Sequence, residues 1–436
     1  MKIFSVSLCV FFSFIISSCA PKFNYVSLQS SMASGNCPGS VQLVNSSKEI
    51  YGSKALLLHM LDSGMIHFQC NSPKEAISFF QNADELAQQL WTKSISKEAA
   101  AFITNDLILP YRGEDFERAL ISLFSAFSYI KLGEYDDAMA DCRRLDTILS
   151  EYNSKYEKKN VYKEDALGRY ISGILSEVDK EYSEAYIYYY ESYKAFKNYA
   201  ASYGTAPPLC LMEDLLRVSV LADKESEARS IMPFDLTVKP MKHNSTKKLG
   251  KIVLVHLNGQ APVKIENKFS VLTPTGPLSI AFPNYISSPP PCHSSKLILK
   301  SSCNTYEQEA VLFEDINQIA IKDLADRKFR ITAKAIARAI AKQAVVQTSS
   351  NEMEKQYGAM AGLMTKIAGN VAASVLEKAD TRSWRTLPGE IYIARVFVQA
   401  GQYQISVENC SGGQKSLESI DIKAGETKFI FNDTIY

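Results

Sequence analysis

The stretch AFSYIKLGEYDDAMADCRRL, residues 126–145, has the pattern of two amphipathic helices joined by a short turn. Apolar residues recur at helical spacing on both sides of the turn-like segment LGEYDDA, residues 132–138. Ala126 and Ala138 are small enough to let two antiparallel helices approach closely, and larger residues beside them fill the remaining space. The stretch therefore predicts a helical hairpin.

Similar spacing recurs elsewhere in the first half of the chain. Gly64 and Phe80 belong to one further copy, Gly173 and Tyr189 to a weaker one, and Ala228 to a marginal fourth. The pattern resembles the tetratricopeptide repeat (TPR), in which small residues bring two helices together and aromatic residues pack beside them. The copies are farther apart than the ~34 residues of a regular repeat. We therefore expect an irregular α-solenoid with insertions.

The second half of the chain has a different pattern. Short segments of alternating apolar residues, bounded by Gly, Pro and Asn, predict strands. These segments are 251–257, 263–269, 278–282, 297–300, 309–313, 391–398, 403–408, 419–422 and 427–431. Helical periodicity returns between residues 315 and 378, which predicts a helical hairpin inserted among the strands.

These patterns predict an α+β multidomain protein. A TPR-like α-solenoid is followed by a β-rich, sandwich-like domain that contains a helical-hairpin insert. The expected segments are a lipoprotein signal peptide (1–18), a lipid-anchored linker (19–48), the helical repeat domain (49–235), a linker (236–248) and the β-rich domain (249–436) with its insert at about 315–378.

The N-terminus has the features of a bacterial lipoprotein signal. Lys2 precedes an apolar run, residues 3–16, that is too short to span ~30 Å of hydrocarbon as a permanent helix. The run ends in ISSC, which resembles the lipobox, so we predict that Cys19 is the lipid attachment site; the alternative is an ordinary secretory signal with an incidental cysteine. In well-studied diderm bacteria, Asp directly after the lipidated cysteine retains lipoproteins in the inner membrane, and here residue 20 is Ala. We therefore expect the protein in the cell envelope, at the outer membrane facing the periplasm in preference to the inner membrane or the cell surface.

Cysteine spacing leaves several possibilities in the second half. Cys292 and Cys303 flank a Ser-rich segment between two predicted strands. They could form a disulfide that closes a hairpin, remain free thiols, or bind a metal together with His293. Because no fourth ligand accompanies them, we expect no metal site.

Three groups of residues are candidates for binding a protein or peptide partner. They are the tyrosines Tyr182, Tyr186, Tyr189 and Tyr193 on one helix face, the loop residues Tyr111, Arg112 and Glu114, and the aromatic–cationic group Arg382, Trp384 and Arg385. Each group has a structural alternative. The tyrosines could belong to the repeat core, the loop could be a helix-entry turn, and Trp384 could anchor its loop in the sheet.

The helical insert is amphipathic. Arg327, Arg330, Lys334, Arg338 and Lys342 form a basic face, and Ile336, Ala337, Ile340, Ala341 and Ala344 form an apolar face. A basic face on a lipid-anchored protein could bind anionic headgroups or an acidic partner. The alternative is a solvated basic face above an apolar face that packs on the sheet.

Composition excludes some functions. The chain has 48 Lys and Arg against 47 Asp and Glu, so its net charge of +1 gives no bulk attraction for nucleic acid. The sequence has no nucleophile, zinc or nucleotide-binding motif. We therefore predict a protein that is not an enzyme, with no catalytic residues and no cofactor.

The lipobox and the helical repeats occur together with YRGEDFERAL (111–120) and DTRSWRTLPGEI (380–391). This combination resembles an uncharacterised bacterial lipoprotein family. The resemblance implies a lipid-anchored protein–protein interaction scaffold in the cell envelope that acts in envelope or peptidoglycan assembly. The alternative is a glycan-binding or glycan-processing protein that uses the β-rich domain, for which we expect a pocket with two carboxylates.

Overall fold

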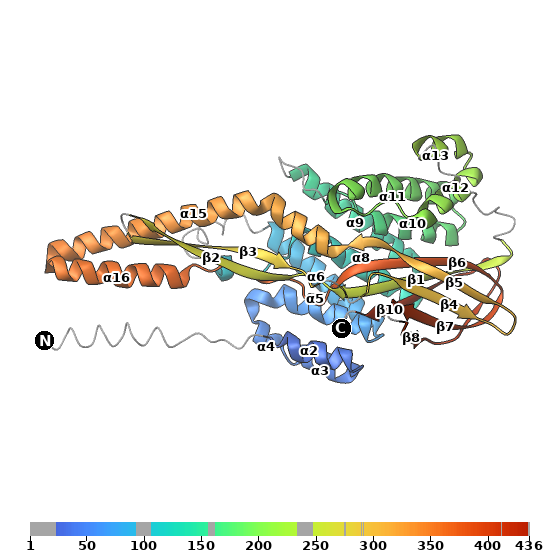
Figure 1. Ribbon diagram of the computed structural model, residues 1–436, viewed down its shortest axis with the longest axis horizontal. Coiled ribbons are helices and arrows are strands. Elements are labelled where there is room, and N and C mark those ends of the chain that lie inside the picture. The colour runs from blue at the N-terminus through green and yellow to red at the C-terminus, as the bar shows by residue number, and fades with distance from the viewer. Residues whose placement is uncertain are drawn as a thin grey trace.

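A computed structural model of the chain describes residues 23–92, 106–155, 162–232, 247–273, 276–288, 290, 292–410 and 412–434. Figure 1 shows a body in which helices cover a twisted sheet, and a long arm that leaves the body at one end. Cys19, the predicted signal peptide and most of the predicted linker 236–248 lie outside the described residues.

The first half is a TPR-like α-solenoid of antiparallel helix pairs. The pairs are α5 (Leu56–Gln69) with α6 (Pro73–Thr92), α8 (Asp115–Leu132) with α9 (Tyr135–Lys155), α10 (Ala166–Val178) with α11 (Tyr182–Tyr203), and α12 (Leu209–Leu221) with α13 (Glu225–Ile231). The short helices η1 (Ser53–Ala55) and η2 (Asp106–Ile108) precede α5 and α8. Each predicted repeat copy coincides with one pair, and the helical hairpin predicted for residues 126–145 is α8 with α9.

Glycine allows close packing within two of the pairs. A Cβ added at Gly64 would lie 2.5 Å from the Phe80 ring, and one at Gly173 would lie 2.4 Å from the Tyr189 ring. No side chain larger than hydrogen fits at either position without displacing an aromatic ring. The expected contact between a small residue and an aromatic residue is thus confirmed in these two copies.

The second half contains an eight-stranded sheet and a separate hairpin. The strands are β1 (Leu249–Gln260), β2 (Val263–Thr273), β3 (Gly276–Ile286), β4 (Ser295–Lys300), β5 (Thr305–Asp315), β6 (Pro388–Gln399), β7 (Gly401–Asn409), β8 (Gln414–Ser416), β9 (Ile420–Ile422) and β10 (Thr427–Thr434). The order in the sheet is β10-β1-β6-β5-β4-β7-β8, with β9 paired to β7. β1 and β10 are parallel, the other neighbouring strands are antiparallel, and β2 pairs only with β3.

The sheet is curled and contributes to two cores. On β1, Val253 and Val255 pack against the helices, whereas Ile252 and Leu254 join β4 and β7 in a core that the sheet encloses itself. Successive side chains of a strand point to opposite faces, so a strand buried on both sides has a nearly continuous apolar sequence. The enclosed core provides the sandwich-like packing expected of the β-rich domain.

The arm consists of the β2–β3 hairpin and the two helices α15 (Ile316–Tyr357) and α16 (Ala359–Leu376), both of which pack on β3. Gly358, with φ +88°, separates the two helices. Gly362 and Gly369 permit close contact between them, because a Cβ at either position would lie within 3 Å of a carbon atom of α15. Figure 1 shows that the helical hairpin extends beyond the tip of the β-hairpin.

The prediction of a linker over residues 19–48 is wrong for residues 25–48. These residues form α2 (Tyr25–Ala33), α3 (Cys37–Asn45) and the start of α4 (Lys48–Tyr51). Asn24 and Asn36 cap the first two helices by accepting hydrogen bonds from backbone N–H groups. Helices α2 and α3 form a small core with α5, and a disulfide between Cys37 and Cys70 joins α3 to the end of α5.

Of the three alternatives for Cys292 and Cys303, the disulfide between them is wrong. Cys292 pairs with Cys410 and Cys303 is a free, exposed thiol. Cys292 and Cys303 lie at opposite ends of β4, so the strand keeps them apart. β4 pairs along its length with β7, and this pairing brings Cys410 close to Cys292. We expect non-reducing peptide mapping to find a 292–410 cross-link, and alkylation of the unreduced protein to label Cys303. A 292–303 cross-link would contradict this pairing.

Candidate functional site

The inner face of the solenoid is filled by the protein's own sheet. The first helices of three repeats, α5, α8 and α10, are buried on nearly every side. The Phe431 ring of β10 lies 5.6 Å from that of Phe68 and 5.5 Å from that of Phe127, and Phe313 of β5 lies 4.6 Å from Tyr170. The helix faces that could have held an extended peptide therefore form the main core.

The tyrosine face does not form an exposed shelf. Tyr186, Tyr189 and Tyr193 are buried, and Tyr182 is half-buried. The Tyr189 hydroxyl donates a hydrogen bond to Glu177 at 2.5 Å. The structure therefore supports the alternative that these tyrosines belong to the repeat core.

The two motifs YRGEDFERAL and DTRSWRTLPGEI lie against each other. Glu117 accepts hydrogen bonds from the Tyr111 hydroxyl and, at 2.7 Å, from the Trp384 backbone N–H. The Arg382 guanidinium lies 5.3 Å from the centre of the Tyr111 ring and donates to the Leu109 carbonyl at 3.1 Å. Residues predicted as two separate partner sites thus form one contact between the halves of the protein, which we call the seam.

Glu114 is the charged centre of the seam. Lys264 of β2 and Arg327 of α15 both form ion pairs with its carboxylate. Burial alone would raise the pKa of Glu114, but the two cations outweigh this effect and hold the pKa well below its usual range. Glu114 also caps α8 in a capping box with Glu117.

Trp384 is an anchor and not an exposed recognition residue. It is 1% exposed, and its ring lies 6.0 Å from those of Phe80 and Phe124. Its indole N–H donates to Thr386 at 2.9 Å. Arg385 stacks 4.3 Å above the Tyr25 ring. Of the predicted partner residues in the two motifs, Arg112 is the one that is exposed, near the Trp91 ring.

Asp62 continues the seam into α5. Its carboxylate accepts hydrogen bonds from Tyr25 at 2.6 Å, Tyr51 at 2.7 Å and Thr386 at 2.8 Å. Burial raises the pKa of Asp62 to about 6, and the three hydrogen bonds limit the rise.

The raised pKa of Asp62 predicts a pH dependence of stability. Between pH ~4 and ~6 the folded state retains a proton that the unfolded state has lost, so unfolding free energy falls as the pH rises across this window. We expect this fall to amount to about 2–3 kcal/mol and to be absent in Asp62→Asn. Urea unfolding of both proteins at pH 4 and pH 7 measures it; parallel pH profiles would contradict the assignment.

The prediction that the basic face of α15 is open to headgroups or a partner is wrong, because this face points inward. Arg338 and Lys342 form ion pairs with Glu377, and Arg327 pairs with Glu114 and Asp323. Arg330 is exposed and Lys334 half-buried. The predicted apolar face is turned outward, with Ile336 and Ile340 exposed. The basic residues therefore hold the arm together and do not form a continuous face for headgroups.

A second charged cluster, which no sequence motif predicted, lies at another contact between the halves. Glu177 pairs with Arg217 at 2.6 Å and with Lys251 at 2.8 Å. Arg395 pairs with Asp214 at 2.9 Å. Lys251 and Arg395 are isolated charges in otherwise apolar strands, LGKIVLV and IYIARVFV. That isolation is the signal that could have revealed them, because a charge is rarely buried without a partner.

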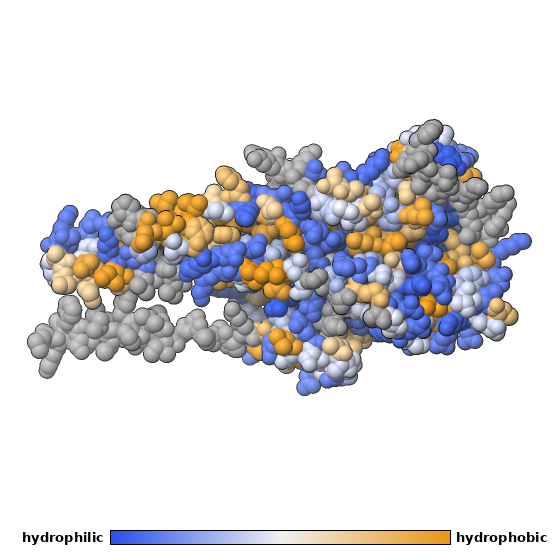
Figure 2. Space-filling view, in the orientation of Figure 1, coloured by the Kyte–Doolittle hydropathy of each residue, from blue (hydrophilic) through white to orange (hydrophobic). Residues whose placement is uncertain are grey.

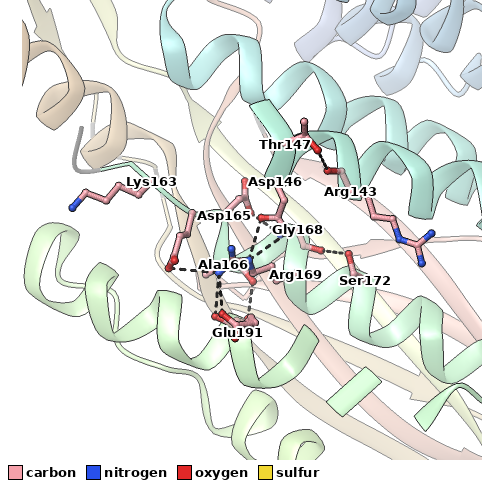
Figure 3. A network of polar contacts seen from close by, with 12 residues as sticks. Arg143, Asp146, Thr147, Lys163, Asp165, Ala166, Gly168, Arg169, Ser172 and Glu191 are labelled. Carbon is pink, nitrogen blue, oxygen red and sulfur yellow. Dashed lines mark hydrogen bonds and ion pairs between the residues drawn. The ribbon is translucent and has the colours of Figure 1, made fainter. Parts of the chain in front are cut away.

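The outer helices carry a partly exposed polar network. Figure 3 shows Arg169 reaching Asp146 and Glu191. The distances are 3.1 Å to Asp146, 3.8 Å to Glu191 and 3.5 Å to Glu164. Nearby, Arg143 of α9 pairs with Glu184 of α11 at 2.7 Å and donates to the Tyr188 hydroxyl at 3.1 Å. These contacts fix α9, α10 and α11 relative to one another.

The described residues offer little for chemistry. None of their His, Cys, Asp and Glu side chains form a group of three that could bind a metal ion. A small cavity between β3, α15 and α16 is lined by Ser279, Lys342 and Asn370 among others, with no carboxylate in its lining. Within the described ranges, no helix has the length and apolar character needed to cross a membrane.

Comparisons with known proteins give only distant similarity. No protein-family model matches the chain, and no curated protein matches its sequence. A kinesin light chain from Podosopora anserina with nearly identical TPR-like repeats aligns at 12% identity and a TM-score of 0.30, covering 47% of this chain and 87% of its own. NprR in complex with its cognate peptide NprX aligns at 15% identity and a TM-score of 0.18, covering 52% of this chain and 71% of its own. The helix pairs are therefore defined by the contacts between helices within this chain.

Proposed function

We propose that this chain is a non-enzymatic, lipid-anchored scaffold of the bacterial cell envelope that binds a protein or peptide partner and acts in envelope or peptidoglycan assembly. In this proposal Cys19 carries the lipid and holds the body at the outer membrane, facing the periplasm. The observation that carries the scaffold role is the filled inner face of the solenoid. It joins the two halves into one body and leaves their outer surfaces for binding.

The three histidines within the described helices and strands support the non-enzymatic part of the proposal. The His59 ring contacts the Val44 carbonyl at 3.2 Å, and His67 stacks on the Phe79 ring. His256 contacts Asn432 and Thr434, and burial lowers its pKa to about 4. None of these three contacts pairs a histidine with a nucleophile and an orienting carboxylate, as general-base catalysis would require.

The outer face of α11 is the surface that fits a protein partner best. Ile187 is 56% exposed and stands beside the half-buried Tyr188 and Tyr190. Arg143 donates a hydrogen bond to the Tyr188 hydroxyl and forms an ion pair with Glu184 beside this apolar group. Aromatic side chains and Arg are enriched at protein interfaces.

Site-specific photo-crosslinking in living cells tests this surface. A photoreactive amino acid at position 187 is expected to give a discrete crosslinked product, and the same amino acid at the exposed sheet position 404 is expected to give none. Equal products from both positions, or none from position 187, would contradict the assignment of the α11 face.

Labelling with palmitate tests the anchor separately. We expect radiolabelled palmitate on the wild type and none on Cys19→Ala. Equal labelling of the two proteins would exclude acylation at Cys19.

A further inference from the structure

The arm exposes an apolar row where a soluble helix would normally expose charge. The exposed apolar residues along one side of α15 are Ala325, Phe329, Ala333, Ile336, Ile340 and Ala344. They follow one another at intervals of three or four residues, so they form one stripe along the helix. Phe329 is 83% exposed and Ile340 is 55% exposed. We call this set the outer stripe.

The second helix of the arm extends the apolar surface. Met360, Leu363, Met364 and Ile367 of α16 are all more than half exposed. Lys366 is the one charged residue among the 18 residues of this helix. Figure 2 shows apolar side chains gathered over both arm helices on the face turned to the viewer.

Along its middle, α15 places charged residues inward and apolar residues outward. Arg338 and Lys342 point toward Glu377, on the side of α15 opposite Ile336 and Ile340. In water this arrangement exposes apolar side chains, although α15 contains charged residues that could have faced the solvent instead. A contiguous apolar patch of this kind marks a docking surface.

Charge distinguishes between the occupants of this surface. Strands β2 and β3 and helices α15 and α16 contain 11 Lys and Arg against 5 Asp and Glu. Counting also Glu114 and Glu377, which pair with four of these cations, the net charge is +4, whereas the whole chain is +1. Two arms side by side would bring two charges of +4 together, which disfavours a second copy. The base of the outer stripe is bordered by three exposed cations, Lys322, Lys328 and Arg330, and one exposed acid, Asp326, a balance that favours an anionic surface.

From this combination we infer that the arm binds an anionic lipid bilayer, with the outer stripe and the exposed residues of α16 inserted at the boundary between headgroups and acyl chains. Apolar side chains at that depth, bordered by Lys and Arg, are the features of an interfacial membrane contact. This contact goes beyond the proposed anchor, since it requires neither Cys19 nor its acylation.

Vesicle sedimentation tests the inference with the chain from residue 20 onward, which lacks Cys19 and retains every described residue. We expect sedimentation with phosphatidylglycerol/phosphatidylcholine vesicles, and much weaker sedimentation with pure phosphatidylcholine or at high salt. The double variant Ile340→Glu/Met364→Glu should lower the affinity at least tenfold. The matched control Val220→Glu changes an exposed aliphatic residue of the body and should bind like the wild type.

Insertion depth gives a second readout. A Trp at position 364 should be quenched by brominated acyl chains, and a Trp at position 220 should not. Circular dichroism of each variant checks that it is folded. Binding that the double variant leaves unchanged would overturn the inference, because it would show attraction by charge alone.

Two other occupants would be recognised by their own results. If the wild type fails to bind vesicles and is oligomeric by light scattering, and the double variant is monomeric, the stripe would be assigned to a second copy. Crosslinks from position 340 to another protein without vesicle binding would assign it to a protein partner. Either result would overturn the lipid inference and leave acylation at Cys19 untouched.

Discussion

Replacing Trp384 by Ala is expected to lower the free energy of unfolding by about 3–5 kcal/mol. The indole is fully enclosed between the α6 residue Phe80 and the α8 residue Phe124, so truncation leaves a large cavity. It also removes the N–H donor to Thr386, which hydrogen-bonds Asp62. The substitution therefore weakens both the packing and the polar contacts of the seam. Urea unfolding followed by circular dichroism measures the loss.

Two controls separate the role of Trp384 from a general effect of aromatic loss. Trp384→Phe retains most of the volume and should cost clearly less than the Ala variant. Trp91→Phe alters the other Trp, which is partly buried with the Arg118 guanidinium 4.4 Å from its ring. We expect this change to cost about 1 kcal/mol. A loss for Trp384→Ala no larger than that for Trp91→Phe would show that the seam does not depend on the indole.

Much of the fold could be predicted because local pattern determines it. The Gly64–Phe80 and Gly173–Tyr189 contacts join residues within one helical hairpin, and the repeat spacing identifies them. The strands predicted in the second half occur as β1 to β7, β9 and β10. β1 also has the continuous apolar sequence of a strand buried on both faces.

Other features depend on contacts between distant residues, which periodicity does not contain. The pattern of α15 identifies a basic side and an apolar side but not which side faces the body. That choice is made by Glu377 and Glu114, which come from other segments and attract Arg338 and Arg327. Helices α2 and α3 have weak amphipathic patterns, so periodicity does not predict them. Caps, a disulfide and contact with α5 hold them in place.

The seam shows why motif residues were assigned to the wrong role. Tyr111, Arg382 and Trp384 have the composition of a recognition site, since aromatic and guanidinium groups are typical of interfaces. They do form an interface, but it lies between the two halves of the same chain. The sequence identified the kind of contact and left its location open.

Glu177→Gln is expected to lower the free energy of unfolding by about 3–5 kcal/mol at neutral pH. The carboxylate is buried and faces both Arg217 and Lys251, so the amide leaves two buried cations without their shared anion. Burial would raise the pKa of Glu177, but these cations hold it well below its usual range. The stability that Glu177 contributes is therefore complete above pH ~4 and is lost as the pH falls further. The difference between wild type and Glu177→Gln should shrink below pH 4.

The same substitution at Glu314 provides the matched test, because Glu314 is even more completely buried than Glu177 and faces no cation at ion-pair distance among the described residues. The Tyr199 hydroxyl donates to its carboxyl at 3.1 Å. Burial and the charge of Asp165 raise the pKa of Glu314 well above its usual range. A neutral carboxyl and an amide have similar shape and can both accept from Tyr199, so Glu314→Gln should change stability by less than about 1 kcal/mol. Equal losses for the two variants in urea unfolding would show that burial determines the loss of stability. A loss confined to Glu177→Gln would show that the paired cations determine it. In that case charge pairing joins the strands to the helical repeats at this contact.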